Sequence, residues 1–186
     1  MNPFLITLVA VSIGISLIED LQHQKIPNVV TYPTMALAVG YHSLLRGFDG
    51  FSFSAEGLAL GIAFFIVPYL LGGMGAGDVK LMGAAGAIFG PRGICIASIL
   101  IILSGGVYGM ILFAIHPRYA ASFLRRMWAT IRTFVLTRQL IFIPWGKDEK
   151  QPIIRYAIPI ALGALVYVFV TITGYDPFRE MPVNKF

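Results

Sequence analysis

Apolar residues fill six stretches of the chain, and polar residues gather in the segments between them. A helix needs about 20 apolar residues to cross a bilayer, with a range of roughly 17–25. The last two stretches meet this range, the first three just reach it or fall slightly short, and the fourth would extend only about 18 Å. The pattern predicts an all-α integral membrane protein with about six transmembrane helices. Their ranges are 3–18, 29–45, 55–71, 79–90, 94–115 and 156–173.

The composition supports a membrane-embedded chain. Hydrophobic residues make up 57% of the sequence and charged residues 12%, whereas soluble domains carry roughly 25% charged residues. The mean hydropathy is +0.79. A length of 186 residues suits one domain, so we expect a single membrane-embedded unit over residues 1–186. The N-terminus lacks a basic segment and a cleavage site, which indicates a retained helix rather than a signal peptide.

The charged and metal-binding residue types exclude several classes of function. A net charge of +5 would suit nucleic acid, but the basic residues lie in loops between apolar runs, so we expect no nucleic-acid partner. Cys95 is the only cysteine, which excludes an internal disulfide and a cysteine-based zinc site. The three histidines do not form an HExxH pattern. We therefore expect no metal and no cofactor.

The distribution of lysine and arginine favours one orientation in the membrane. With both termini outside, ten of the fourteen basic residues lie in inner loops and four in outer loops. Inner loops carry an excess of basic residues in membrane proteins. This predicts a multi-pass protein of the cytoplasmic (inner) membrane. The second and third helices form one hairpin, so Asp20 and Asp78 are predicted on the same face, the cytoplasmic one.

The segment 116–152 is the only long polar stretch and is predicted to be cytoplasmic. Apolar residues recur in it at helical spacing, and four arginines flank them. This pattern fits an amphipathic helix lying on anionic lipid. A cytoplasmic helix packed on the bundle, or one that docks substrate, fits it as well. The apolar positions are Phe123, Met127, Ile131, Phe134 and Val135, and the arginines are Arg125, Arg126, Arg132 and Arg138.

A glycine-rich segment precedes the short fourth helix and ends at Asp78. Glycines occupy positions 72, 73, 75 and 77, and each costs about 1 kcal/mol in a helix relative to alanine. They predict a tight loop with unusual backbone dihedrals that brings Asp78 to the helix start. A carboxylate near membrane depth is a functional candidate. Asp78 would also serve simply as an N-cap, which aspartate favours.

Asp20 is the second candidate, at the end of the first helix beside Glu19. A negative charge at a helix C-terminus opposes the helix dipole by roughly 0.3–1 kcal/mol. The two acids would alternatively only mark where the chain leaves the lipid. As a pair, however, Asp20 and Asp78 would hold one water between them. Repulsion and desolvation would leave one proton on the pair near neutrality, which suits water-mediated peptide hydrolysis without a metal.

At these residues the sequence resembles a known family. Residues 75–86, GAGDVKLMGAAG, resemble the GxGD motif of the type IV prepilin peptidases, which are membrane aspartic proteases. Asp20, followed by the sequence KIPN at residues 25–28, resembles their first-aspartate motif, and residues 155–163 resemble their last helix. The likeness covers most of the chain in family order. It is closest to the short form that serves tight-adherence (Flp) pili, and archaeal preflagellin peptidases are similar.

The resemblance implies an intramembrane or interfacial aspartic endopeptidase. It would remove the short basic leader of prepilin-like, single-helix membrane substrates on the cytoplasmic side, with Asp20 and Asp78 as catalytic residues. Gly75, Gly77 and Lys80 would support the motif. Longer relatives carry an N-terminal region with paired cysteines that is linked to N-methylation. This chain starts with a helix and has one cysteine, so we expect no methyltransferase region.

The roles of Lys80 and of the small residues in the fourth helix are secondary expectations. Lys80 would tune the aspartate pair or face lipid phosphate, and positive-inside placement explains it equally well. The run of small residues at 83–87 would permit close helix packing and draw the fourth helix toward the first, bringing the acids together.

Two other functions remain open at this stage. One is a GxGD protease of other membrane peptides, as in signal peptide peptidases. Those relatives usually place the first acid in a Tyr-Asp pair, whereas Glu19 precedes Asp20 here. The other is a non-enzymatic platform or channel component of a pilus or secretion machine. The sequence specifies neither the substrate nor the oligomeric state.

Overall fold

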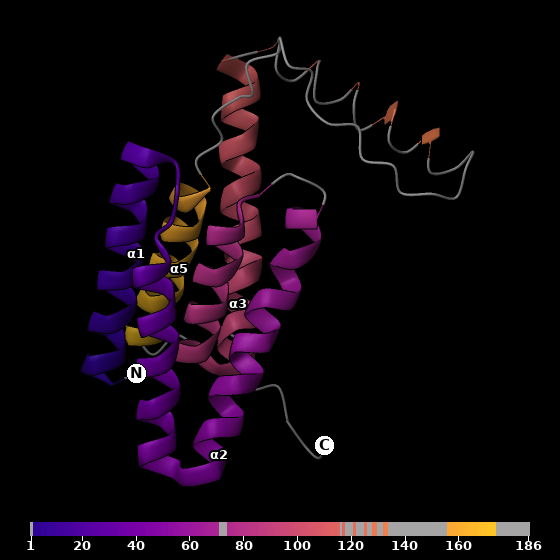
Figure 1. The fold of residues 1–186 in the computed structure, drawn as a ribbon. Helices are drawn as coiled ribbons and strands as arrows, with labels where there is room; N and C mark the ends of the chain where they lie inside the picture. The colour runs from indigo at the N-terminus through magenta and orange to yellow at the C-terminus, as the bar shows by residue number, and fades with distance from the viewer. Residues whose placement is uncertain are drawn as a thin grey trace.

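In the computed structural model, the described residues are 2–70, 74–115 and 156–173, with seven single positions between 117 and 133. All regular structure within them is helical, which confirms the all-α class for this part of the chain (Figure 1). The helices are α1 (Pro3–His23), α2 (Asn28–Leu70), α3 (Ala76–Ile115) and α5 (Ala157–Ile172). Three of them, α1, α2 and α3, are long and apolar enough to cross a membrane.

The prediction of six separate transmembrane helices was wrong. α2 has 43 residues and α3 has 40, and each joins two predicted segments without an intervening loop. Each chain reversal is made by a single glycine with positive φ: Gly47 (φ 60°, ψ −133°) in α2 and Gly90 (φ 73°, ψ −179°) in α3. Glycine adopts such angles at little cost. Figure 1 shows α2 folded back on itself at its lower end, so that its two arms lie side by side.

α1 is longer than predicted. Asn2 caps its start, because the Asn2 side chain accepts a 3.0 Å hydrogen bond from the Phe4 amide, and Pro3 suits the first helical position. The helix ends where Gln24 takes a left-handed conformation (φ 54°) and donates its amide to the Asp20 carbonyl. The helix thus ends at His23, five residues beyond the predicted end at residue 18, and Asp20 lies inside its last turn.

The first arm of α3, residues 76–89, forms the centre of the bundle. From Asp78 to Gly90 every residue except Lys80 is buried. A helix that is apolar on all sides is surrounded by protein or lipid, and here α2 and α5 pack against α3. This explains how a segment too short to span a bilayer is accommodated, because helices and not lipid surround it.

The small residues of this arm pack closely, but not against the helix that was predicted. A β-carbon built at Gly86 would collide with the Gly57 backbone, and one built at Gly83 would lie 3.0 Å from Ile62. Both partners belong to α2. The prediction that these residues draw the arm toward α1 was therefore wrong. α2 offers matching glycines, whereas the α1 glycine, Gly14, meets nothing within 4 Å.

The C-terminal end of the same arm is held by two polar side chains of α2. Ser54 donates a 2.7 Å hydrogen bond to the Ala87 carbonyl, and His42 Nε2 lies 3.3 Å from the Ile88 carbonyl. A carbonyl only accepts, so His42 donates from Nε2. The last carbonyls of a helix lack partners within it, and these two bonds provide them at the break before Gly90.

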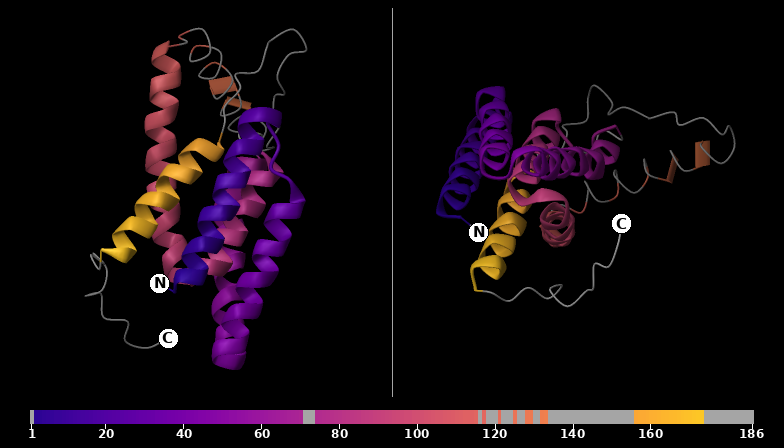
Figure 2. Two further views of the ribbon diagram at one scale, coloured as in Figure 1. Left: turned by 90° about the vertical axis from the view of Figure 1, so that its left-hand side faces the viewer. Right: turned by 90° about the horizontal axis from the view of Figure 1, so that it is seen from below.

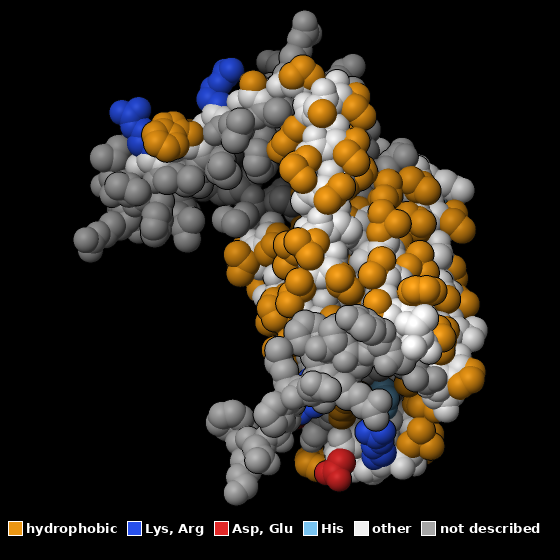
Figure 3. Space-filling model, turned by 180° about the vertical axis from the view of Figure 1, so that it is seen from behind, with side chains coloured by type: hydrophobic (Ala, Val, Ile, Leu, Met, Phe, Trp, Pro, Cys, Tyr) orange, Lys and Arg blue, Asp and Glu red, His pale blue; other side chains and the backbone are white. Residues whose placement is uncertain are grey.

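The outside of the bundle is apolar along its length. Figure 3 shows hydrophobic side chains over the visible face of the helices, with Lys and Arg side chains near both ends and an Asp or Glu side chain near the lower end. α5 runs obliquely to α1 (Figure 2). Most of the segment 116–152 lies outside the described residues, so its predicted amphipathic helix stays a prediction. Of its described positions, Arg125 and Trp128 are exposed.

Candidate active site

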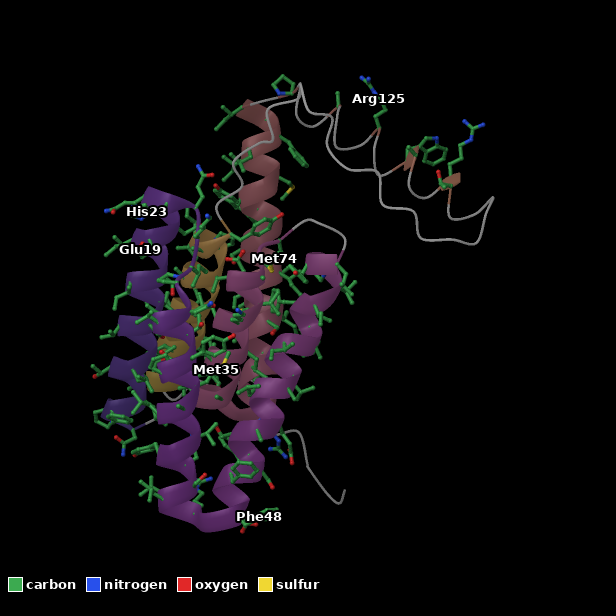
Figure 4. The ribbon with its side chains drawn as sticks, viewed as in Figure 1. Glu19, His23, Met35, Phe48, Met74 and Arg125 are labelled. Carbon is green, nitrogen blue, oxygen red and sulfur yellow. The ribbon has the colours of Figure 1, made fainter. Side chains whose placement is uncertain are left out.

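Asp20 lies on the buried face of α1. This face is built from positions three or four apart, which share one side of a helix, and Asp20 is its last member, with 8% of its surface exposed. The neighbouring Glu19 points elsewhere and contacts His23 Nδ1 at 3.0 Å (Figure 4). The side chains of these adjacent acids thus point in different directions: Asp20 faces the bundle and Glu19 faces its surface. The face comprises Leu5, Val9, Ser12, Ile13, Ser16 and Asp20.

Asp78 lies in the first turn of α3 with 7% of its surface exposed. Because α3 begins at Ala76, Asp78 is the third helical residue and not the N-cap. Its Oδ2 accepts a 3.1 Å hydrogen bond from the Gly75 amide, which is the reaching-back half of a capping box. Its Oδ1 is buried and has no hydrogen-bond partner among the described residues. One oxygen therefore secures the helix start, and the other is buried without a hydrogen bond from the described residues.

The structure brings Asp20 and Asp78 to the same end of the bundle. The end of α1 and the start of α3 lie together there, as Glu19, His23 and Met74 show (Figure 4). The two carboxyl groups are close enough to interact electrostatically. Residues 58 positions apart in the sequence thus form one buried acidic pair.

The glycines before Asp78 are needed for a different reason from the one predicted. Among the described glycines, only Gly47 and Gly90 have positive φ, so the expectation of unusual dihedrals was wrong for Gly75 and Gly77. Gly77 is instead required by a close approach, since a β-carbon there would lie 2.8 Å from the β-carbon of Ile26. At Gly75 a β-carbon would lie 3.1 Å from Asp78 Oδ2. Gly72 and Gly73 lie outside the described residues.

Lys80 contacts the start of α2, directly after the connection from α1. Its Nζ donates a 2.9 Å hydrogen bond to Asn28 Oδ1 and lies 5.1 Å from the centre of the Tyr32 ring. The structure therefore gives Lys80 a side-chain partner that the sequence did not indicate.

Two further residues border the acidic pair. Ser16 lies one turn before Asp20 on the same face, is fully buried, and its Oγ has no hydrogen-bond partner in the described part of the chain. The four-residue spacing of Ser12, Ser16 and Asp20, which puts them on one helix face, is the sequence signal that would have indicated Ser16.

Tyr156 precedes α5 and is half-buried. Burial, the Asp78 carboxyl and Tyr108 raise the pKa of its hydroxyl. The Tyr156 hydroxyl, with its raised pKa, therefore stays protonated.

The described residues contain no group of three His, Cys, Asp or Glu side chains placed to hold a metal ion. The chemistry that the arrangement supports is acid–base chemistry by two carboxyl groups in a site of low water content. Two neighbouring carboxyl groups that hold one proton between them can do this, one accepting a proton and the other donating one.

Comparison with known proteins gives one match. The model of the type IV leader peptidase family matches residues 5–110, a range that includes both Asp20 and Asp78. Comparisons with curated proteins and with solved structures gave no significant match.

Proposed function

The chain belongs to the type IV leader peptidase family, and from this premise we propose that it is an aspartic endopeptidase that removes the leader of prepilin-like membrane proteins. Family membership makes it a peptidase, and its three long apolar helices make it a membrane protein. Asp20 and Asp78 are the proposed catalytic residues. The observation that carries the proposal is their placement, because two helices bury one acid each at the same end of the bundle.

In the proposed reaction the pair holds one proton and one water. The ionised carboxylate takes a proton from the water, whose oxygen bonds to the scissile carbonyl carbon while the protonated carboxyl donates its proton to the carbonyl oxygen. The tetrahedral intermediate then breaks its C–N bond. The leaving nitrogen receives the proton taken from water, and the second carboxyl regains its own from the intermediate. The assignment of Asp78 to this exchange is supported by its Oδ1, which is buried and has no hydrogen-bond partner among the described residues.

We propose that the substrate is a single hydrophobic helix with a short basic leader, cut on the cytoplasmic side. The excess of basic residues in the predicted inner loops supports this orientation. The acidic pair at the end of the bundle would suit cleavage where a substrate helix emerges from lipid.

The test is cleavage of a co-expressed prepilin-like protein by purified variants. Asp20→Asn and Asp78→Asn should each abolish cleavage while the protein still inserts in membranes. Glu19→Gln is the matched control, because Glu19 adjoins Asp20 but points to His23; it should cleave normally. Substantial cleavage by either asparagine variant would refute the two-aspartate mechanism. Cleavage of other membrane peptides, but of no prepilin-like protein, would replace the proposed substrate.

A further inference from the structure

Two contacts hold the α1–α2 connection and the first residue of α2 against the first two turns of α3. Ile26 lies so close to Gly77 that no side chain fits there. Two residues further on, Asn28 accepts the 2.9 Å hydrogen bond from Lys80. We call this pair of contacts, Ile26 with Gly77 and Asn28 with Lys80, the α1–α3 clasp.

The clasp matters because α1 is packed differently from the other helices. Gly57 of α2 meets Gly86 of α3, and Gly163 of α5 lies against Ile101 of α3, so these helices approach backbone to backbone. Gly14 of α1 has open space around it. α1 packs through the side chains of its buried face. A contact near its Asp20 end is therefore a further constraint on where Asp20 lies.

Each acid lies only a few residues along the chain from one side of the Ile26–Gly77 contact. Ile26 follows Asp20 by six residues, and the turn at Gln24 between them is closed by a hydrogen bond to the Asp20 carbonyl. Gly77 directly precedes Asp78. Holding Ile26 on Gly77 thus restricts how far the end of α1 moves from the start of α3.

We infer that Lys80 is a positioning residue, which holds Asn28 and with it the α1–α2 connection so that Asp20 stays at Asp78. The inference rests on the proposed function, since it assigns both acids to catalysis.

The direction of the Lys80 side chain distinguishes positioning from a direct charge effect. Residues two apart on a helix do not share a face, so Lys80 and Asp78 point differently, and Asp78 is buried while Lys80 is partly exposed. The ammonium group is engaged by Asn28 and by the Tyr32 ring. Its neighbours are therefore residues of the connection and the start of α2.

The kinetic test compares Lys80→Met, Asn28→Leu and the double variant. Each single change should lower kcat about tenfold with KM and the pH profile little changed, and the double variant should be no worse than the worse single one. Asn28→Asp keeps the acceptor and should retain activity. Lys25→Met is the control, because Lys25 is an exposed lysine of the same connection, and it should be neutral. A shifted pH profile in Lys80→Met, with normal kcat in Asn28→Leu, would overturn the inference in favour of a charge effect.

A second measurement does not depend on proteolysis. Asp20→Cys and Asp78→Cys, combined in a Cys95→Ala background, should be bridged by a short bifunctional thiol reagent. Adding Lys80→Met or Asn28→Leu should slow the bridging severalfold, and adding Lys25→Met should not. Unchanged bridging would overturn the inference even if kcat fell. An inactive wild-type protein would refute the proposed function, and the bridging rates would still decide whether the clasp positions the acids.

Discussion

The Ser54 hydroxyl donates a 2.7 Å hydrogen bond to the Ala87 carbonyl and thereby joins the second arm of α2 to the end of the arm that carries Asp78. Ala87 is among the last residues before the break at Gly90, where helix carbonyls lack partners within the helix. Both residues are fully buried. No solvent replaces this bond in the interior, so it contributes to holding the central arm at the end opposite Asp78.

Replacing Ser54 by alanine should therefore destabilise the fold. Leaving a buried carbonyl unsatisfied costs about 1–3 kcal/mol, and thermal unfolding in detergent should report a lower Tm. Ser43→Ala is the control, because Ser43 bonds the Val39 carbonyl of its own helix. Equal losses of Tm in the two variants would show that the Ser54 bond has no special role.

Gly77→Ala should impair cleavage through the close contact with Ile26. The new β-carbon would lie 2.8 Å from the Ile26 β-carbon and 3.3 Å from its backbone nitrogen and oxygen, so the connection must move away from α3. Misplacement of a catalytic group by about 1 Å reduces rates on the order of 10²-fold. The measurement is kcat for cleavage. Gly106→Ala, at a helical glycine with nothing within 4 Å, should cleave normally; an active Gly77→Ala enzyme would contradict the contact.

Substitutions of Asp78 should separate its capping bond from its catalytic role. Asp78→Asn keeps an oxygen for the Gly75 amide, so its Tm should stay near that of the wild type while cleavage is lost. Asp78→Ala also loses the capping bond and should be less stable by about 1 kcal/mol. Asp78→Ser should be inactive, because a serine hydroxyl does not share a titrating proton near neutrality. A stable and active Asp78→Ser protein would return Asp78 to a purely structural role.

Cysteine labelling should test the orientation in the membrane. Phe48 lies at the bend of α2, at the end of the bundle opposite Glu19 and Met74 (Figure 4). In a Cys95→Ala background, Phe48→Cys should react with an impermeant thiol reagent from outside, and Leu140→Cys should react only after the membrane is opened. The reverse pattern would contradict the cytoplasmic placement of Asp20 and Asp78.

The arginine-rich segment offers a test of lipid contact. Replacing Arg125, Arg126, Arg132 and Arg138 by glutamine should weaken association of the segment with anionic vesicles, by about 1 kcal/mol for each basic residue near the surface. Neutral vesicles provide the comparison. Cleavage in neutral detergent should be unaffected, because none of these residues belongs to the proposed site. Loss of activity there would instead indicate a role in substrate docking.

Local pattern was sufficient for the all-α membrane class of the protein and for singling out Asp20 and Asp78 as candidate site residues. A bilayer demands apolar segments of a given length, so the hydropathy pattern alone predicted helices in the right places. Glycine before Asp78 and two acids at the end of α1 conflict with simple helix preferences, and such conflicts mark functional positions. These signals depend only on neighbouring residues, and for that reason they were readable in the sequence.

The tertiary structure decided how these parts meet. Gly47 and Gly90 turn the chain within one residue, which merges predicted helices in pairs. Gly77 is required by contact with Ile26 and not by its own dihedrals. Lys80 finds its partner Asn28 across 52 positions of sequence. Contacts of this kind depend on which surfaces fit together after the helices pack, and no local periodicity encodes that fit.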